Sequence, residues 1–147
     1  NILFDCDQHQ AVCIVDLDTV MPGLVMNDFG DAIRFGASTA LEDEKDLSQV
    51  ACDMHLFEVY TKGFIEGTQG KLTPQEVELL PLGALMMTLE CGIRFLTDYL
   101  QGDVYFKTDY PEHNLIRCRT QFQLVSDMEK KWDQMTAIVH QYAYVHQ

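Results

Sequence analysis

The stretch from Thr73 to about Leu100 constrains the fold of this chain more than any other segment. It opens with Thr73, Pro74 and Glu76, which supply a capping threonine, a proline at the first helical position and a glutamate three residues after the threonine. The residues that follow are apolar on nearly all sides. Because a helix that is hydrophobic all round has to be buried, we predict a central helix here.

The N-terminal segment has the pattern of a β-hairpin. Residues 1–5 and 12–16 are short apolar runs, and a polar stretch separates them. No segment after Val20 resembles a strand as closely. We therefore predict a hairpin within residues 1–20 and a helical part over residues 28–147.

The spacing of apolar residues indicates three further helices. The first, with Asp28 at its N-cap or first turn, is about ten residues long, and the second covers about 46–66. The last carries an apolar stripe for about thirty residues, from Leu115 to Tyr142. The chain is thus expected to be a mainly α, single domain of 147 residues, with a short hairpin before about four helices.

The charge balance limits the partners of the protein. Ten basic residues stand against twenty-three acidic ones, for a net charge of −13. Nucleic acids are bound largely through Lys and Arg, so we expect no nucleic-acid partner and no anionic membrane surface. We see neither a membrane-spanning apolar run nor a signal-peptide pattern. A nucleotide would need a divalent cation, because carboxylates alone repel phosphates.

The five cysteines are odd in number, and no two form a C-x-x-C pair. This spacing argues against a disulfide framework or a zinc site. We therefore expect reduced, buried thiols and a cytoplasmic location.

Four carboxylates lie within sixteen residues: Asp16 and Asp18 at the end of the second expected strand, then Asp28 and Asp31. Oxygen ligands of this kind suit a hard cation, and Mg²⁺ needs few protein carboxylates because substrate phosphates supply other ligands. The alternative is that these residues only cap a turn and a helix.

Two known patterns fit a strand that ends in D-x-D. Residues 12–20 satisfy the haloacid-dehalogenase phosphatase motif, in which Asp16 would be the nucleophile and Asp18 the general acid. That fold needs further parallel strands, whereas the rest of this chain is expected to be helical. In the kinase-like pattern, a catalytic loop ending in Asn leads into a hairpin whose second strand ends in a metal-binding Asp. Asn1 and Asp16 have the spacing of that hairpin.

Three segments carry a resemblance to a known family, and together they run over nearly the whole chain. They are VCIVDLDTVMPGLVMNDFGDAIRFGAST, ELLPLGALMMTLECGIRFLTDYLQGDVYF and HNLIRCRTQF. The chain closely resembles N-acetylhexosamine 1-kinases of the aminoglycoside-phosphotransferase and choline-kinase superfamily. The resemblance implies the C-terminal lobe of a protein-kinase-like fold.

The resemblance also implies roles for particular residues. Asn1 and Asp16 match the two magnesium ligands, and Asp28 matches an acid that braces the catalytic loop. Residues that line the sugar pocket of the hexosamine kinases are matched by Phe35, Arg94 and Tyr105. The catalytic base would lie upstream of Asn1, so no catalytic residue is expected within this chain, and the nucleotide-binding N-lobe is not part of it.

Without the resemblance, the pocket residues have plainer interpretations. Arg94 would be costly if buried unpaired, and a structural pair with Glu90, four residues earlier, explains it equally well. Tyr105 would serve surface packing as readily as a sugar, and Phe35 would be a core residue.

The expected function is therefore that of an ATP- and Mg²⁺-dependent kinase lobe that phosphorylates the anomeric hydroxyl of an N-acetylhexosamine. A kinase for homoserine, choline or an aminoglycoside, and a non-catalytic helical interaction module, are the alternatives. Because the chain starts at Asn1, inside an expected strand, we interpret it as a fragment that is inactive alone. We further expect a homodimer through an exposed hairpin edge.

Overall fold

The computed structural model describes residues 2–18 and 20–144. Its elements, in chain order, are β1 (Ile2–Asp5), β2 (Gln10–Ile14), α1 (Val25–Gly36), the short 3₁₀ helix η1 (Leu47–Gln49), α2 (Met54–Gly67), α3 (Pro74–Gln101), α4 (His113–Lys130) and α5 (Trp132–Ala143). The prediction of a mainly helical chain with a short antiparallel hairpin is confirmed. The kinase-like lobe stays a prediction.

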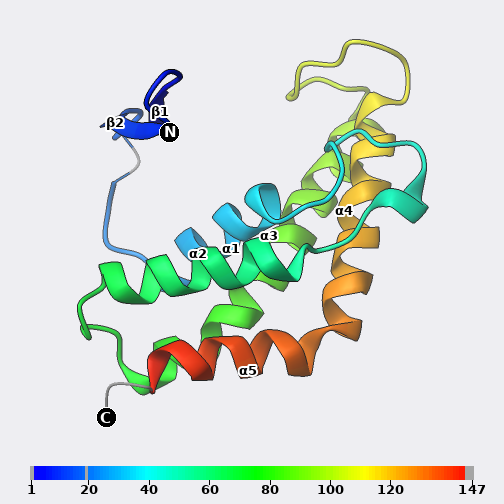
Figure 1. The fold of residues 1–147 in the computed structure, drawn as a ribbon. Helices are drawn as coiled ribbons and strands as arrows, with labels where there is room; N and C mark the ends of the chain where they lie inside the picture. The colour runs from blue at the N-terminus through cyan, green and yellow to red at the C-terminus, as the bar shows by residue number, and fades with distance from the viewer. Residues whose placement is uncertain (1, 19, 145–147) are drawn as a thin grey trace.

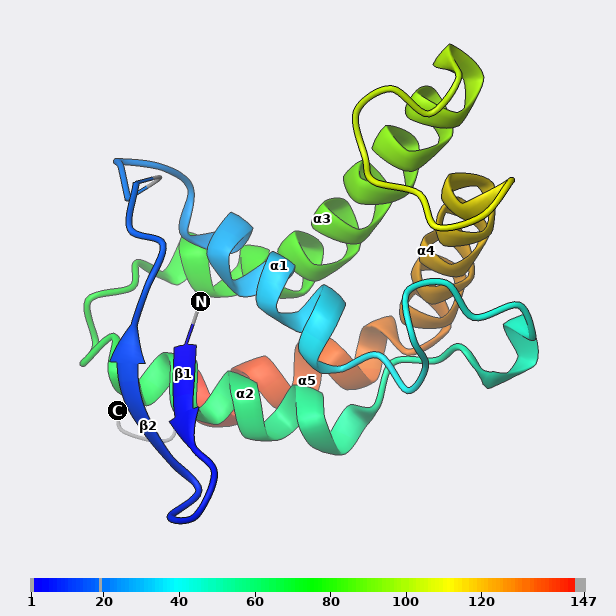
Figure 2. The same cartoon turned by 90° about the horizontal axis from the view of Figure 1, so that it is seen from above.

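Helix α3 is the central element, as its sequence predicts. Thr73 Oγ1 accepts the Glu76 N–H at 3.2 Å, and Glu76 Oε2 accepts the Thr73 N–H at 2.8 Å, so the capping box is complete. The helix ends before Gly102, whose φ of 92° is the left-handed conformation that glycine adopts without strain. Helices α1, α4 and α5 pack along α3 (Figures 1 and 2).

Two glycines let α1 and α3 approach each other closely. A Cβ atom added to Gly30 would clash with the Gly83 carbonyl, and one added to Gly83 would clash with the Met26 carbonyl. The two backbones therefore touch at this crossing, and neither glycine has room for a side chain.

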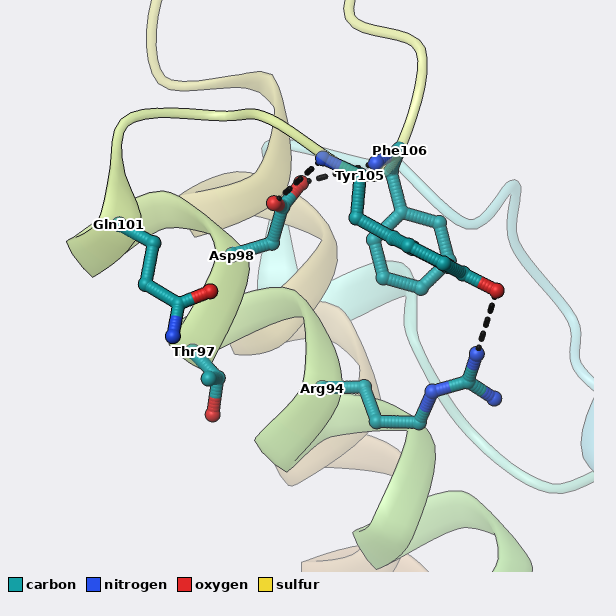
Figure 3. A pocket seen from close by; sticks show the side chains of 6 residues that line it. All are labelled: Arg94, Thr97, Asp98, Gln101, Tyr105 and Phe106. Carbon is teal, nitrogen blue, oxygen red and sulfur yellow. Dashed lines mark hydrogen bonds between the residues drawn. The ribbon is translucent and has the colours of Figure 1, made fainter.

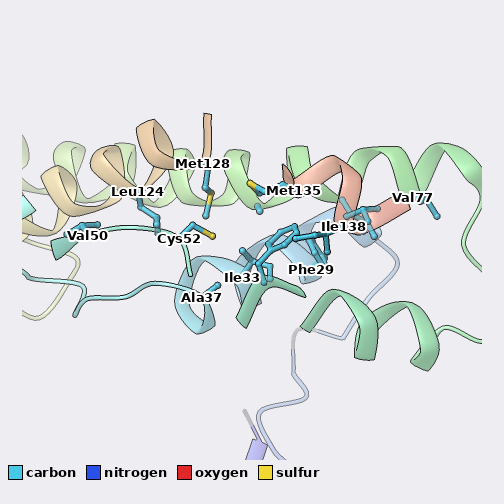
Figure 4. Close-up of a cluster of buried hydrophobic side chains, with 14 residues drawn as sticks. Phe29, Ile33, Ala37, Val50, Cys52, Val77, Leu124, Met128, Met135 and Ile138 are labelled. Atoms are coloured by element: carbon cyan, nitrogen blue, oxygen red, sulfur yellow. The ribbon is translucent and has the colours of Figure 1, made fainter. Parts of the chain in front are cut away.

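The hydrophobic core joins all five α-helices. Its aromatic centre is Phe29 of α1, whose ring centroid lies 5.9 Å from that of Phe57 and 5.3 Å from that of Phe64 on α2. Val77, Met128 and other buried side chains of α3, α4 and α5 complete it (Figure 4).

The helix expected over 46–66 is wrong at its start. The segment forms η1 first, and α2 begins only at Met54. Two aspartates explain this, because Asp46 accepts the Ser48 N–H and Asp53 accepts the N–H groups of residues 55 and 56, so each side chain caps its own helix. Helix α1 begins at Val25, so Asp28 occupies the first turn, which is one of the two positions predicted for it.

The prediction of one long last helix is also wrong, because the chain turns at Lys131 and forms two helices, α4 and α5. Lys131 Nζ donates to Asp127 Oδ2 at 2.6 Å and to the Cys52 carbonyl at 2.9 Å. Asp127 Oδ2 also accepts the Cys52 N–H at 2.7 Å. The break is thus tied to a segment some eighty residues earlier in the chain.

The prediction that α3 is buried on all sides is wrong, because one side of the helix is exposed. Met86, Ile93 and Leu100 are exposed, because α1, α4 and α5 cover the other sides. By length and composition alone, α3 is apolar enough to cross a membrane, although the core helix of a globular domain passes the same test.

The hairpin packs on no helix within the part of the chain that the structure describes. β1 pairs with β2 so that Ile2 lies opposite Ile14 and Leu3 opposite Cys13. Its apolar side chains, Phe4 included, are exposed, and in Figure 1 it stands apart from the helices.

All five cysteines are free, but the expectation that they are buried holds only for Cys52 and Cys118. Cys6 and Cys13 are exposed because the hairpin that carries them is uncovered. Burial raises the pKa of the Cys52 thiol to about 12, so this side chain is an inert part of the core.

Candidate functional site

The loop that follows α3 is organised by one buried carboxylate. Asp98 is 3% exposed and accepts the backbone N–H groups of Val104, Tyr105 and Phe106 at 2.8–2.9 Å. The Asn114 amide of α4 donates to the same carboxylate at 2.8 Å. Asp98 therefore fixes the loop against the ends of two helices, with the Tyr105 and Phe106 side chains directed along α3 (Figure 3).

These bonds determine the ionisation of Asp98. Burial acts to raise the pKa of its carboxyl, but the hydrogen bonds from the Phe106, Tyr105 and Val104 backbone and from Asn114 outweigh burial and lower the pKa below 3.8. Asp98 is thus an anionic anchor, whose oxygens already accept hydrogen bonds from the loop and from Asn114.

Arg94 and Tyr105, two residues predicted to line one pocket, do lie together. They line a cavity of about 350 Å³ with Phe106 and Asp98, beside Thr97 and Gln101 (Figure 3). Arg94 Nη2 lies 3.5 Å from the Tyr105 hydroxyl, the long limit of a hydrogen bond. Tyr105 is 73% exposed, so its ring and hydroxyl are open to a ligand.

The predicted structural pair of Arg94 is also present. Arg94 Nε lies 3.7 Å from Glu90 Oε1, and both side chains are about half exposed. An exposed pair of this spacing contributes roughly 0.5 kcal/mol or less. Arg94 is therefore neither buried nor fixed by Glu90, and its guanidinium keeps donors that face the cavity.

Phe35, the third predicted pocket residue, lines a different cavity. It is 75% exposed on the last turn of α1, so the alternative of a core residue is wrong. This second cavity, also of about 350 Å³, lies among the end of α1, the 38–42 loop and Gln121 of α4.

Arginines and aromatic rings connect the regions of the two cavities. The Arg94 guanidinium lies 5.4 Å from the Phe106 ring centre, and Phe106 packs on Phe95 with centroids 4.7 Å apart. The guanidinium of Arg117 in α4 lies 5.4 Å from the centre of the Phe95 ring. Its Nε is also 3.6 Å from Oε2 of Glu42, a residue of the second cavity. Three of the four arginines of this acidic chain, Arg34, Arg94 and Arg117, therefore belong to this part of the fold.

A second contact holds the 103–112 loop to the loop before η1. The Tyr110 hydroxyl donates to Asp43 Oδ2 at 2.9 Å, and its ring stacks on buried His113 at a centroid distance of 4.3 Å. His113 Nδ1 accepts the Asp109 N–H at 3.1 Å, so the imidazole bonds the loop as well. Both loops beside the cavities are thus anchored by polar groups.

The predicted metal ligands do not form a recognisable metal site within the described residues. Asn1 lies outside the described residues. Asp16 is exposed just after β2, with a left-handed φ of 63° that is uncommon for a residue other than glycine. Asp28, the predicted brace, is exposed in the first turn of α1. Over residues 2–18 and 20–144, no three or more His, Cys, Asp or Glu side chains are grouped to hold a metal.

Sequence reasoning missed Asp98 and Gln121. Asp98 could have been found from the sequence, because it lies one turn after Arg94 in an apolar helix, and a carboxylate buried there requires hydrogen-bond partners. Gln121 could not, because its surroundings come from α1 and the 38–42 loop, about eighty residues away in sequence.

Compared with models of known protein families, the chain matches none.

Proposed function

We propose that this chain is the C-terminal lobe of an ATP-dependent small-molecule kinase that phosphorylates the anomeric hydroxyl of N-acetylhexosamines. The observation that supports it most is the cavity in which Arg94 and Tyr105 meet, on a loop anchored by Asp98. Guanidinium and phenol donors beside the exposed Tyr105 ring and the half-buried Phe106 ring suit a neutral sugar, whose hydroxyls need donors and whose ring has apolar faces.

The charge of this cavity favours a neutral ligand over the cationic alternatives. Arg94 is its cation, and the one carboxylate in its lining, Asp98, is occupied by backbone and amide donors. A choline or an aminoglycoside would therefore meet a positive charge without a free anion. Homoserine, whose carboxylate would pair with Arg94, remains the second candidate.

In this proposal, Mg²⁺ would be held by Asp16 with Asn1, since oxygen donors of this type suit the ion. The ion would supply charge stabilisation to the phosphates of ATP. The residues of this chain would bind and orient the acceptor sugar, and the catalytic base would come from upstream of Asn1. By itself the chain is therefore expected to show no ATP turnover with N-acetylhexosamine and magnesium.

Titration of the isotope-labelled chain with N-acetylglucosamine, N-acetylgalactosamine, homoserine, choline and kanamycin tests the proposal by NMR. We expect shifts around Tyr105 and Phe106 with the acetamido sugars. Arg94→Met should weaken binding about tenfold, because one charge-assisted hydrogen bond is lost. The matched control is Arg119→Met, at an exposed arginine of α4. Binding of none of these compounds would favour the interaction module.

A further inference from the structure

Gln121 is a buried side chain whose polar end lacks a partner. The residue is 3% exposed, and its Oε1 makes no hydrogen bond within the described part of the chain. A buried polar atom without a partner destabilises the fold, and native structures contain few of them. Because an amide carries both an acceptor and a donor, the Gln121 side chain can bond either a hydroxyl or an amide group of a ligand.

The other polar side chains that line its cavity are already bonded. Arg34 donates to Glu42 at 2.9 Å and to Asp31 at 3.0 Å. The hydroxyls of Ser38 and Thr39 donate to main-chain carbonyls, at 3.0 Å and 2.6 Å. Among the described residues that line this cavity, Gln121 is thus the one with a buried polar atom that has no hydrogen-bond partner.

The lining defines the chemistry of an occupant. Phe35 and Leu41 are each 75% exposed and offer apolar contact. The charge of Arg34 is balanced by Asp31 and Glu42, so the cavity offers no free charge. The fitting ligand part is therefore uncharged, with an apolar surface and one hydroxyl or amide group that bonds Gln121.

We propose that Gln121 is a specificity-determining residue, whose side-chain amide bonds an uncharged hydroxyl or amide group of the substrate while Phe35 and Leu41 pack on its apolar part. An acetamido sugar has this combination of groups. The inference rests on the proposed function, to which it adds a second subsite built from α1, the 38–42 loop and α4.

Gln121→Met tests the role, because methionine keeps the length of the side chain and removes its hydrogen-bonding groups. The dissociation constant for N-acetylglucosamine should rise about tenfold, since the buried ligand group loses its partner. The melting temperature of the free variant should stay equal or rise, because the unpartnered atom is gone. Gln134→Met, at an exposed glutamine of α5, is the matched control and should change neither value.

A second measurement tests the role without the variant, in case Gln121→Met does not fold. In the parent chain, the side-chain amide resonances of Gln121 should shift during titration with N-acetylglucosamine, with the same dissociation constant as those of the Tyr105 backbone. Parent-like affinity of Gln121→Met, or an unmoved Gln121 amide, overturns the inference. If binding persists and only Arg94→Met weakens it, the proposed function stands without this subsite. If the folded parent binds no acetamido sugar, both fail.

Discussion

Asp98 fixes the loop that carries Tyr105 by accepting three backbone N–H groups and one side-chain amide. Those bonds require the ionised carboxylate, and they lower its pKa although burial acts in the opposite direction. In the unfolded chain the carboxyl titrates near 3.8. The folded state therefore binds this proton more weakly than the unfolded state does, and the linkage stabilises the fold above that pH.

Asp98→Asn should accordingly lower the free energy of unfolding at pH 7, because the amide places N–H groups against the donors of the loop. The difference from the parent should shrink as the pH falls below 3.8 and through the lower folded pKa, where Asp98 itself is protonated. Urea unfolding at pH 7, 5 and 3 measures it, with exposed Asp133→Asn as control. A difference that does not vary with pH would contradict this role.

Asp16, just after the second strand of the hairpin, has a left-handed φ of 63°. In an active enzyme that contains this segment, Asp16→Asn should reduce turnover by several orders of magnitude and leave the melting temperature unchanged. Loss of a metal carboxylate removes roughly several kcal/mol of charge stabilisation. Steady-state kinetics over a magnesium series gives the answer, with exposed Asp7→Asn for comparison. Near-normal turnover at ordinary magnesium would rule Asp16 out as the ligand.

At the scale of elements, the backbones of α1 and α3 are in direct contact. Gly83 faces the Met26 carbonyl, and Gly30 faces the carbonyl of Gly83, so neither position has room for a methyl group. This crossing places the end of α1, with Phe35, beside the second cavity.

Gly83→Ala should destabilise the chain by roughly 3 kcal/mol, because the helices must separate to admit the methyl group. Gly63→Ala is the matched control. Gly63 lies in α2 with open space around it, and alanine there should stabilise the helix by about 0.5–1 kcal/mol. Thermal or urea unfolding compares the two variants, and equal effects of the two substitutions would refute the close crossing.

The whole molecule combines a cored helical body with an uncovered hairpin. Ile2, Leu3, Phe4 and Ile14 are exposed on two short strands, although burial of such side chains is worth roughly 1.5–3 kcal/mol each. The edges of a two-stranded sheet also leave backbone groups open to pairing. Association through the hairpin would therefore bury these apolar side chains and pair the open strand edges.

We therefore expect this chain to self-associate through the hairpin. Light scattering over a concentration series should show a mass above 16.8 kDa that increases with concentration. The double variant Phe4→Lys and Ile14→Lys should reduce association, whereas Leu100→Lys, at an exposed residue of α3, should not. A monomer at all concentrations would contradict the expectation.

Local signals predicted much of the fold, because local interactions form those elements. The capping box at Thr73 and the left-handed Gly102 delimit α3, and both act within one helical turn. The two apolar runs gave the hairpin for the same reason. In the site, Arg94 and Tyr105 were foreseen by resemblance, and eleven residues of one continuous segment bring them together.

By itself, then, the sequence determined the central helix and the hairpin, which depend on neighbours in the chain, whereas the Arg94–Tyr105 pair was implied by the resemblance. Only the tertiary structure decided the break at Lys131, where a side chain bonds a carbonyl 79 residues away. It also decided that Phe35 lines a separate cavity with Gln121, because that cavity joins residues 34–42 to a side chain about eighty residues later in the sequence. The pattern of one segment cannot encode such contacts, since their free energy arises only when the segments pack together.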